Sequence, residues 1–217
     1  MCVAVPKVGC STLKFAVHTL EDPRNEIQWW HTHADWPGWC VLDHPDPLVL
    51  EILSSAEWFK FCFVRNPYDR IVSAWKSKIV LEDDTHYSWL RDAVRETAHF
   101  PIDRAEPASF REAFDYVTGE DLVAGRDWHF RPQCDLLHPE VIAYDVIGRF
   151  ENFAEDFRVI FERLDAPPHV LAMATTRYNA TPHTNFRDFY DPELAARVYT
   201  FYEQDFVAFG YDRASWR

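Results

Sequence analysis

A nearly uninterrupted apolar run at 58–64, W-F-K-F-C-F-V, constrains the fold more than any other part of the chain. A strand buried on both faces of a parallel sheet shows this composition. Asn66 and Pro67 follow closely and predict the N-cap and first residue of a helix. A buried strand leading directly into a helix is typical of α/β proteins. We therefore predict an α/β, P-loop-NTPase-like three-layer fold with a central parallel sheet flanked by helices.

The start of the chain repeats this plan around a tight turn. The apolar residues Val3–Val5 predict a strand, and apolar positions from Leu13 to Leu20 recur at helical spacing. Between them, the turn 6–14 reads P-K-V-G-C-S-T-L-K. Such a turn directs backbone N–H groups and the positive end of a helix dipole at one point, where a phosphate or sulfate binds. An ordinary βα turn that binds nothing is the alternative.

The opening turn does not match the Walker A pattern. That pattern places a lysine directly after its second glycine and follows it with a hydroxyl for Mg²⁺. Here Lys7 precedes Gly9, and no glycine occurs earlier in the chain. Lys7 adds a positive charge, and Ser11 and Thr12 add hydroxyls, so an anion remains the expected ligand.

A second anion-binding arrangement follows the apolar run. Arg65 stands at the predicted carboxyl end of the strand, the edge at which open α/β sheets bind ligands. Ser73 lies eight positions later, on the predicted helix. An arginine fork and a serine hydroxyl together suit one phosphate group. Taken singly, each residue is equally compatible with an ordinary surface position.

Composition limits the other functional classes. The 217 residues carry a net charge of −13, which argues against a nucleic-acid partner. With 47% hydrophobic residues the chain can bury a good core, and we expect one domain over 1–217. No segment has the length and apolarity of a transmembrane helix, and no signal peptide is evident.

The five cysteines form no C-x-x-C pair, and their number is odd. Reduced thiols in a cytoplasmic protein are the simplest interpretation. No ligand spacing typical of zinc is present, so we expect no metal.

His31 and His33 lie in an aromatic-rich stretch, 29–39. In an extended segment their side chains point to the same side. The pair is compatible with a general base, with two structural histidines, or with a metal site. No third ligand stands at a recognisable spacing.

The two anion-binding motifs, P-K-V-G-C-S-T-L-K and F-V-R-N-P-Y-D-R-I-V-S-A-W, resemble the paired signatures of sulfotransferases that use 3′-phosphoadenosine 5′-phosphosulfate. The chain resembles the carbohydrate sulfotransferases most. The resemblance implies this nucleotide as co-substrate, without a metal. It implies that Arg65 and Ser73 bind the 3′-phosphate. The implied 5′-phosphosulfate site comprises Lys7, Val8, Gly9, Cys10, Ser11, Thr12 and Leu13.

Later segments extend the resemblance. Residues 127–133 resemble the family's H-W-x-P-Q segment, and 144–151 resemble its Y-D-x-I-G-K-x-E strand and turn. The family often has a cysteine pair between these segments, but 135–140 has none, which favours a bacterial-style relative without that disulfide. In the family, a late loop folds over the nucleotide. The corresponding polar residues here are Arg177, Asn179, His183 and Arg187.

The implied reaction is sulfuryl transfer to a hydroxyl of a carbohydrate or related acceptor. Lys7 is expected to neutralise the leaving phosphate. We favour His33, with His31 beside it, as the base, because a similar H-x-H pair serves the acceptor in the uronyl 2-O-sulfotransferase branch. His129 is the second choice, followed by Asp35 or Glu82. A small-molecule kinase and a non-catalytic nucleotide-binding relative remain as alternatives; the sequence fixes neither the acceptor nor the oligomeric state.

Overall fold

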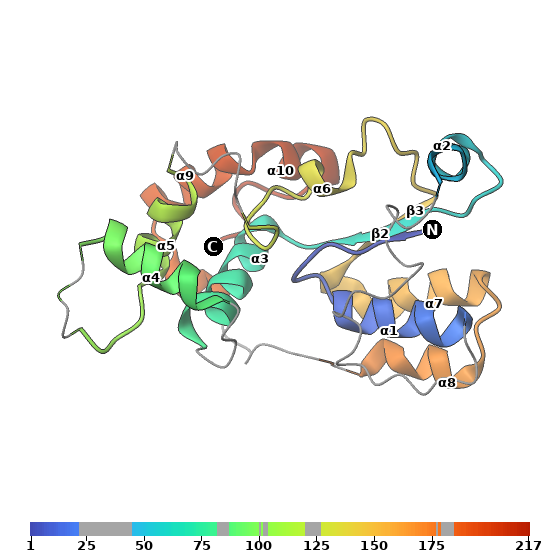
Figure 1. The fold of residues 1–217 in the computed structure, drawn as a ribbon, viewed down its shortest axis with the longest axis horizontal. Coiled ribbons are helices and arrows are strands. Elements are labelled where there is room, and N and C mark those ends of the chain that lie inside the picture. Colours follow the sequence, from blue (N-terminus) through green and yellow to red (C-terminus); the bar gives the residue numbers. More distant parts are fainter. Residues whose placement is uncertain are drawn as a thin grey trace. The chain divides into compact units, whose positions relative to one another are not determined.

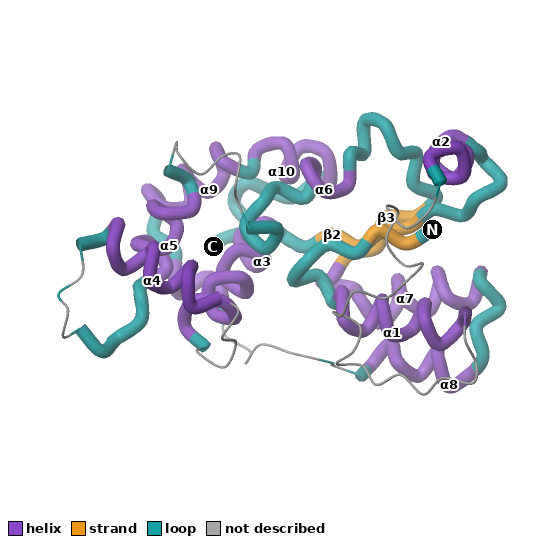
Figure 2. The backbone as a smooth tube through the Cα atoms, in the orientation of Figure 1, coloured by secondary structure: helices purple, strands orange, loops and turns teal. Residues whose placement is uncertain are grey.

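The computed structural model describes residues 1–21, 45–81, 87–99, 101, 104–119, 127–176, 178 and 185–217 (Figures 1 and 2). The described residues form two compact units. The first unit comprises 1–65 and 133–180, and the second comprises 66–132 and 181–217. Each unit is considered by itself below.

The first unit contains a parallel sheet of three strands. These are β1 (Cys2–Val3), β2 (Phe61–Val64) and β3 (Val146–Arg149), in the order β1-β2-β3. Phe61 pairs with Cys2 on one side and with Val146 on the other. All four residues of β2 are buried. The prediction of a central, parallel, buried strand is therefore confirmed, although the strand begins three residues later than the apolar run.

Helices of the first unit pack beside this sheet. Figure 1 shows α1 (Cys10–Glu21), α7 (Phe153–Arg163) and α8 (Pro168–Leu171) together on one side of the strands. The remaining helical segments are α2 (Asp46–Ser54), α6 (Cys134–Leu137), η6 (Phe150–Asn152) and η7 (Ala172–Thr175). The apolar positions Leu48 and Ile52 predict a buried face for α2. Both residues are half-buried, whereas no residue of this helix is fully buried. Apolar periodicity shows which face a helix turns inward and not how completely that face is covered.

The apolar stripe of α7 forms the core under the sheet, as its helical spacing predicts. Phe157, Ile160 and Phe161 are completely buried. The ring of Phe161 meets that of Phe61 edge-on, at 5.9 Å between centroids. This contact joins α7 to the central strand and fixes the position of the helix that supports the opening turn.

The second unit is helical in its described part. Its segments are α3 (Pro67–Trp75), η3 (Lys76–Val80), α4 (Ser88–Thr97), α5 (Phe110–Val117), η8 (Phe186–Phe189), α9 (Pro192–Phe201) and α10 (Glu203–Phe209). Asn66 caps α3, with its side chain accepting from Tyr68 N at 3.0 Å. The S-x-x-E pattern at 109–112 predicts a capping box, and Ser109 and Glu112 form one at the start of α5. Both sequence predictions of helix starts are confirmed.

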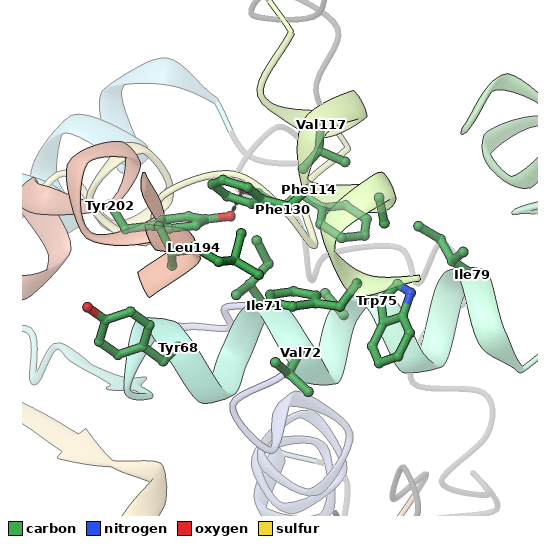
Figure 3. Close-up of a cluster of buried hydrophobic side chains, with 14 of the residues drawn as sticks. Tyr68, Ile71, Val72, Trp75, Ile79, Phe114, Val117, Phe130, Leu194 and Tyr202 are labelled. Atoms are coloured by element: carbon green, nitrogen blue, oxygen red, sulfur yellow. Dashed lines mark hydrogen bonds between the residues drawn. The ribbon is translucent and has the colours of Figure 1, made fainter. Parts of the chain in front are cut away.

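One cluster of apolar side chains holds these helices together (Figure 3). Ile71 of α3, Leu194 of α9 and Tyr202 are each at most 2% exposed. Trp75 also lies in the cluster and donates from Nε1 to Ala108 O at 2.8 Å, which satisfies its polar atom inside the core. The helical spacing of Leu194, Val198, Tyr202 and Phe206 predicts an inward stripe of the last helix. All four residues are buried, although the helix is interrupted at Tyr202.

The structure thus confirms an α/β protein with a parallel sheet and many helices. Throughout the described ranges, we find no helix with the length and apolarity required to cross a bilayer. A single domain over 1–217 stays a prediction.

Candidate functional site

The turn between β1 and α1 has an unusual backbone. Lys7 and Gly9 both adopt positive φ angles, of 70° and 85°. A Cβ on Gly9 would also lie 2.6 Å from Cε2 of Phe153. Two features therefore require glycine at this position: the positive φ angle of the backbone and the Phe153 ring packed against it. The ring belongs to α7, so the core helix of the first unit shapes the turn.

The N-terminus of α1 provides the donors that the sequence predicted. The first intrahelical bond runs from Leu13 N to Gly9 O at 3.1 Å. The amides of Cys10, Ser11 and Thr12 precede it, and helix geometry gives them no acceptor within α1. Amides of this kind, at the positive end of a helix dipole, suit an anionic ligand.

Arg65 reaches the same turn from the end of β2. Its guanidinium donates to Lys7 O at 2.9 Å, and its Cζ lies 4.2 Å from the centroid of the Phe150 ring. The hydrogen bond and the ring stacking hold the guanidinium beside the turn. Two residues predicted separately, Lys7 and Arg65, are thereby brought together within one unit.

Gln133 fixes the backbone of Arg65, and sequence analysis did not identify this role. Its Nε2 donates to Arg65 O and its Oε1 accepts from Arg65 N, both at 2.9 Å. Gln133 is completely buried. A side-chain amide is the only uncharged side-chain group that offers a donor and an acceptor in this reciprocal geometry. The available signal was the family-like segment at 127–133, but it did not indicate a contact with Arg65.

The other residues of the turn are placed as follows. Val8 and Leu13 are completely buried, so their side chains belong to the core. Ser11 and Thr12 are at most 5% exposed, and Thr12 Oγ1 donates to Thr176 O at 3.4 Å. Cys10 is half-buried. A ligand at the turn would meet backbone amides more than these side chains.

Two groups of predicted residues are not placed at the turn. Ser73 lies on α3 and is 8% exposed, but it belongs to the second unit, so its pairing with Arg65 stays a prediction. His31 and His33 lie outside the described residues, and so do Arg177, Asn179 and His183 of the late loop. Their roles also stay predictions.

Burial controls the chemistry of the thiol before the turn. It raises the pKa of Cys2 to about 12, so this thiol stays protonated at neutral pH and is a poor nucleophile or metal ligand. Cys2, Cys10, Cys62 and Cys134 are all free thiols. Among the described residues, no group of three His, Cys, Asp or Glu side chains has a metal-binding arrangement.

This arrangement of turn, helix N-terminus and arginine forms a candidate anion-binding site at the edge of a parallel sheet. The sulfotransferase family model matches residues 1–212, which is nearly the whole chain. The chain therefore belongs to the sulfotransferase family, and the resemblance noted from its motifs is confirmed.

The relatives are carbohydrate sulfotransferases. Carbohydrate sulfotransferase 12 from Mus musculus is 30% identical over 242 residues, covering 96% of this chain and 57% of the relative. Carbohydrate sulfotransferase 14 from Homo sapiens is 28% identical, covering 76% of this chain and 44% of the relative. Carbohydrate sulfotransferase 11 from Rattus norvegicus is 25% identical, covering 95% of this chain and 63% of the relative. The chain spans about half the length of the first of these relatives. No solved structure matches it significantly.

Proposed function

We propose that this protein transfers a sulfuryl group from 3′-phosphoadenosine 5′-phosphosulfate to a hydroxyl of a carbohydrate. The family and the carbohydrate sulfotransferases among its relatives support the reaction class. The observation that carries the proposal is the hydrogen bond from Arg65 to Lys7 O, because it brings the arginine of the second motif to the opening turn within one unit. Parallel β1 and β2, with α1 starting at the turn, support the P-loop-like description of this site.

In this proposal, the turn holds the 5′-phosphosulfate. Lys7 and the amides of Cys10, Ser11 and Thr12 stabilise the negative charge that develops on the departing phosphate. Arg65 and Ser73 bind the 3′-phosphate, which distinguishes this donor from ATP. The net charge of −13 makes a local cationic cluster necessary for binding such an anion.

The protein's contribution to the step is positioning, charge stabilisation and proton removal. The acceptor oxygen forms a bond to sulfur as the bond from sulfur to the phosphate oxygen breaks. Adenosine 3′,5′-bisphosphate leaves. His33 with His31 beside it is the base predicted from the sequence, and this assignment remains a proposal. No residue assigned here needs a metal for its role.

The free thiols support a reducing compartment, so we also propose a cytoplasmic location. Redox titration of the purified protein with thiol counting tests this: five reactive thiols after denaturation without reductant are expected, and fewer would indicate a disulfide.

The function is tested by incubating the protein with the donor and a panel of glycans. The expected products are adenosine 3′,5′-bisphosphate and a sulfated glycan, identified by mass spectrometry. ATP with Mg²⁺ serves as the matched control for a kinase. Phosphate transfer from ATP, or nucleotide binding without product from any acceptor, would contradict the proposal.

A further inference from the structure

Lys7 has a backbone conformation that its surroundings must hold in place. Its φ of 70° lies in the left-handed region, which residues with a side chain rarely adopt. Such a conformation persists only where neighbouring groups constrain it. The carbonyl of Lys7 accepts a hydrogen bond from Arg65 Nη1 at 2.9 Å. Arg65 therefore constrains the backbone of the opening turn, in addition to placing a charge beside it.

The same hydrogen bond fixes the amide that follows. The peptide bond between Lys7 and Val8 is trans, so the C=O of Lys7 and the N–H of Val8 point in opposite directions within one rigid plane. A guanidinium that holds the carbonyl on one side consequently holds the N–H on the other. Val8 belongs to the predicted 5′-phosphosulfate site. The orientation of one backbone donor of that site thus depends on Arg65.

The ring of Phe150 holds the guanidinium in position. Arg65 and Phe150 directly follow Val64 and Arg149, the last paired residues of β2 and β3. Cζ of Arg65 lies 4.2 Å from the centroid of the Phe150 ring, which is half-buried. A planar guanidinium stacked on an aromatic face is attracted to it and cannot tilt away without losing this contact.

A second ring connects Phe150 to the glycine of the turn. The rings of Phe150 and Phe153 have their centroids 6.1 Å apart. Phe153 in turn packs against Gly9, where a Cβ would lie 2.6 Å from its Cε2. The turn therefore has two supports, one at the carbonyl of Lys7 and one at Gly9. Both depend on neighbouring rings in the connection from β3 to α7.

Asp156 of α7 fixes the backbone of this connection. Its carboxylate accepts hydrogen bonds from Arg149 N at 2.6 Å and from Asn152 Nδ2 at 2.9 Å. These two bonds lie on either side of Phe150 in the chain, so they attach the ring to both the sheet and the helix. A site keeps its geometry when its supporting residues are themselves held in this way.

We propose that Arg65 is a positioning residue of the 5′-phosphosulfate site and that Phe150 is a second positioning residue, which acts through Arg65. This inference rests on the proposed function. Arg65 keeps the peptide between Lys7 and Val8 in the orientation that receives the phosphosulfate, and the ring keeps the guanidinium there. This role is separate from the binding of the 3′-phosphate. Arg65 therefore contributes to the affinity for a nucleotide that has no 3′-phosphate.

The test compares Arg65→Met, Phe150→Leu and their double variant in the full chain. Methionine keeps an apolar stem without a donor, and leucine keeps an apolar side chain without a ring. Phe150→Tyr retains the ring and is the conservative variant. Phe59→Leu is the matched control, because Phe59 is also half-buried and has the Cζ of Arg163 at 4.2 Å from its centroid. Phe59 precedes β2, so its stack lies at the other edge of the sheet.

Hydrogen exchange of the Leu13 amide is measured first, in the protein without nucleotide. This amide donates to Gly9 O at 3.1 Å, so its protection reports the geometry of the turn in the absence of any ligand contact. The amide of Asp145, which donates to Lys60 O at 2.8 Å, is the reference for global stability.

Relative to this reference, we expect Leu13 to exchange about fivefold faster or more in Arg65→Met and in Phe150→Leu. Exchange should be unchanged in Phe59→Leu and in Phe150→Tyr. Unchanged exchange in both Arg65→Met and Phe150→Leu would overturn the inference, and so would an equal change in Phe59→Leu.

Calorimetry with adenosine 5′-phosphate and adenosine 3′,5′-bisphosphate then measures the effect on binding. We expect Arg65→Met to weaken the binding of adenosine 5′-phosphate about fivefold or more, and Phe150→Leu about three- to fivefold. In the Arg65→Met background, Phe150→Leu should have no further effect, because the ring acts through the guanidinium.

Unchanged affinity of Arg65→Met for adenosine 5′-phosphate, or additive losses in the double variant, would overturn the inference and leave the proposed function standing. Failure of the wild type to bind the bisphosphate would overturn the proposed function. The two failures are distinguishable, because the exchange of Leu13 is measured without nucleotide.

Discussion

Replacing Gly9 with alanine should both destabilise the protein and weaken nucleotide binding. The φ of 85° places an alanine in the left-handed region, at a cost of about 1–2 kcal/mol. The added Cβ would lie 2.6 Å from Phe153 Cε2, and such overpacking costs about 1–3 kcal/mol. Together the two effects amount to about 2–5 kcal/mol, a large part of the roughly 5–15 kcal/mol typical of a folded protein.

Urea unfolding separates the backbone strain from the steric clash. The four proteins compared are the wild type, Gly9→Ala, Phe153→Leu and the double variant. Leucine removes the ring atoms that the new Cβ approaches, so the double variant should lose less stability than the sum of the single changes. A coupling of about 1–3 kcal/mol measures the steric part, because the backbone strain is unaffected by Phe153.

The stability of Gly9→Ala and the coupling in the cycle each have a result that would refute this reasoning. A Gly9→Ala protein within about 0.5 kcal/mol of the wild type, the range of an ordinary surface substitution, would mean that the turn does not have this backbone. Strict additivity in the cycle would mean that Phe153 does not support it.

Three further predictions follow from the described contacts. Gln133→Leu should lower the free energy of unfolding by about 2–4 kcal/mol in urea titrations, because it removes two hydrogen bonds and leaves the backbone N–H and C=O of Arg65 unpaired; an unchanged midpoint would contradict this. The hydrogen bond from Arg104 lowers the pKa of Glu112 from 4.5 to about 2, so Glu112 stabilises the fold above its ordinary pKa and loses this effect as pH falls toward 2. Glu112→Gln should therefore cost about 1 kcal/mol at pH 7 and progressively less below pH ~4.5, since solvent screens this partly exposed pair; a pH-independent difference would count against the assignment. Trp128 is 67% exposed, and its indole offers an apolar face on which a sugar ring can stack. Trp128→Ala should therefore raise KM for the glycan about 5- to 30-fold with little change in kcat, as expected for a loss of about 1–2 kcal/mol of stacking. Steady-state kinetics with unchanged KM would reject the stacking role.

Local signals in the sequence predicted much of the fold. The apolar run ending at Val64 marked the central strand, and Asn66 marked the start of α3, since caps and buried strands depend on neighbouring residues in the chain. That the apolar face of α2 is only half-buried was not predictable, because the degree of burial depends on segments distant in sequence. The run also began earlier than β2, as hydrophobicity alone does not define strand pairing.

Local signals in the sequence also predicted part of the site. Lys7 and Arg65 were identified from residue type and position at strand ends. Their contact was not, because the hydrogen bond from Arg65 ends on a backbone carbonyl, and every residue has one. Gln133 was missed because a buried glutamine looks like any polar residue until its partner 68 positions away is known. His129 was noticed, but the sequence did not indicate that its Nδ1 lies 2.6 Å from Oδ1 of Asp127, because residues two positions apart contact each other only in particular loop conformations.

The central claim is that the opening turn and Arg65 bind a nucleotide that carries phosphates at both its 3′ and 5′ positions. Calorimetric titration with adenosine 3′,5′-bisphosphate tests it most directly, with Lys7→Met and Arg65→Met beside the wild type and adenosine 5′-phosphate as the second ligand. We predict binding to the wild type, a loss of about tenfold or more in either variant, and weaker binding of adenosine 5′-phosphate. Equal affinity for the two nucleotides, or unchanged affinity in both variants, would contradict the account.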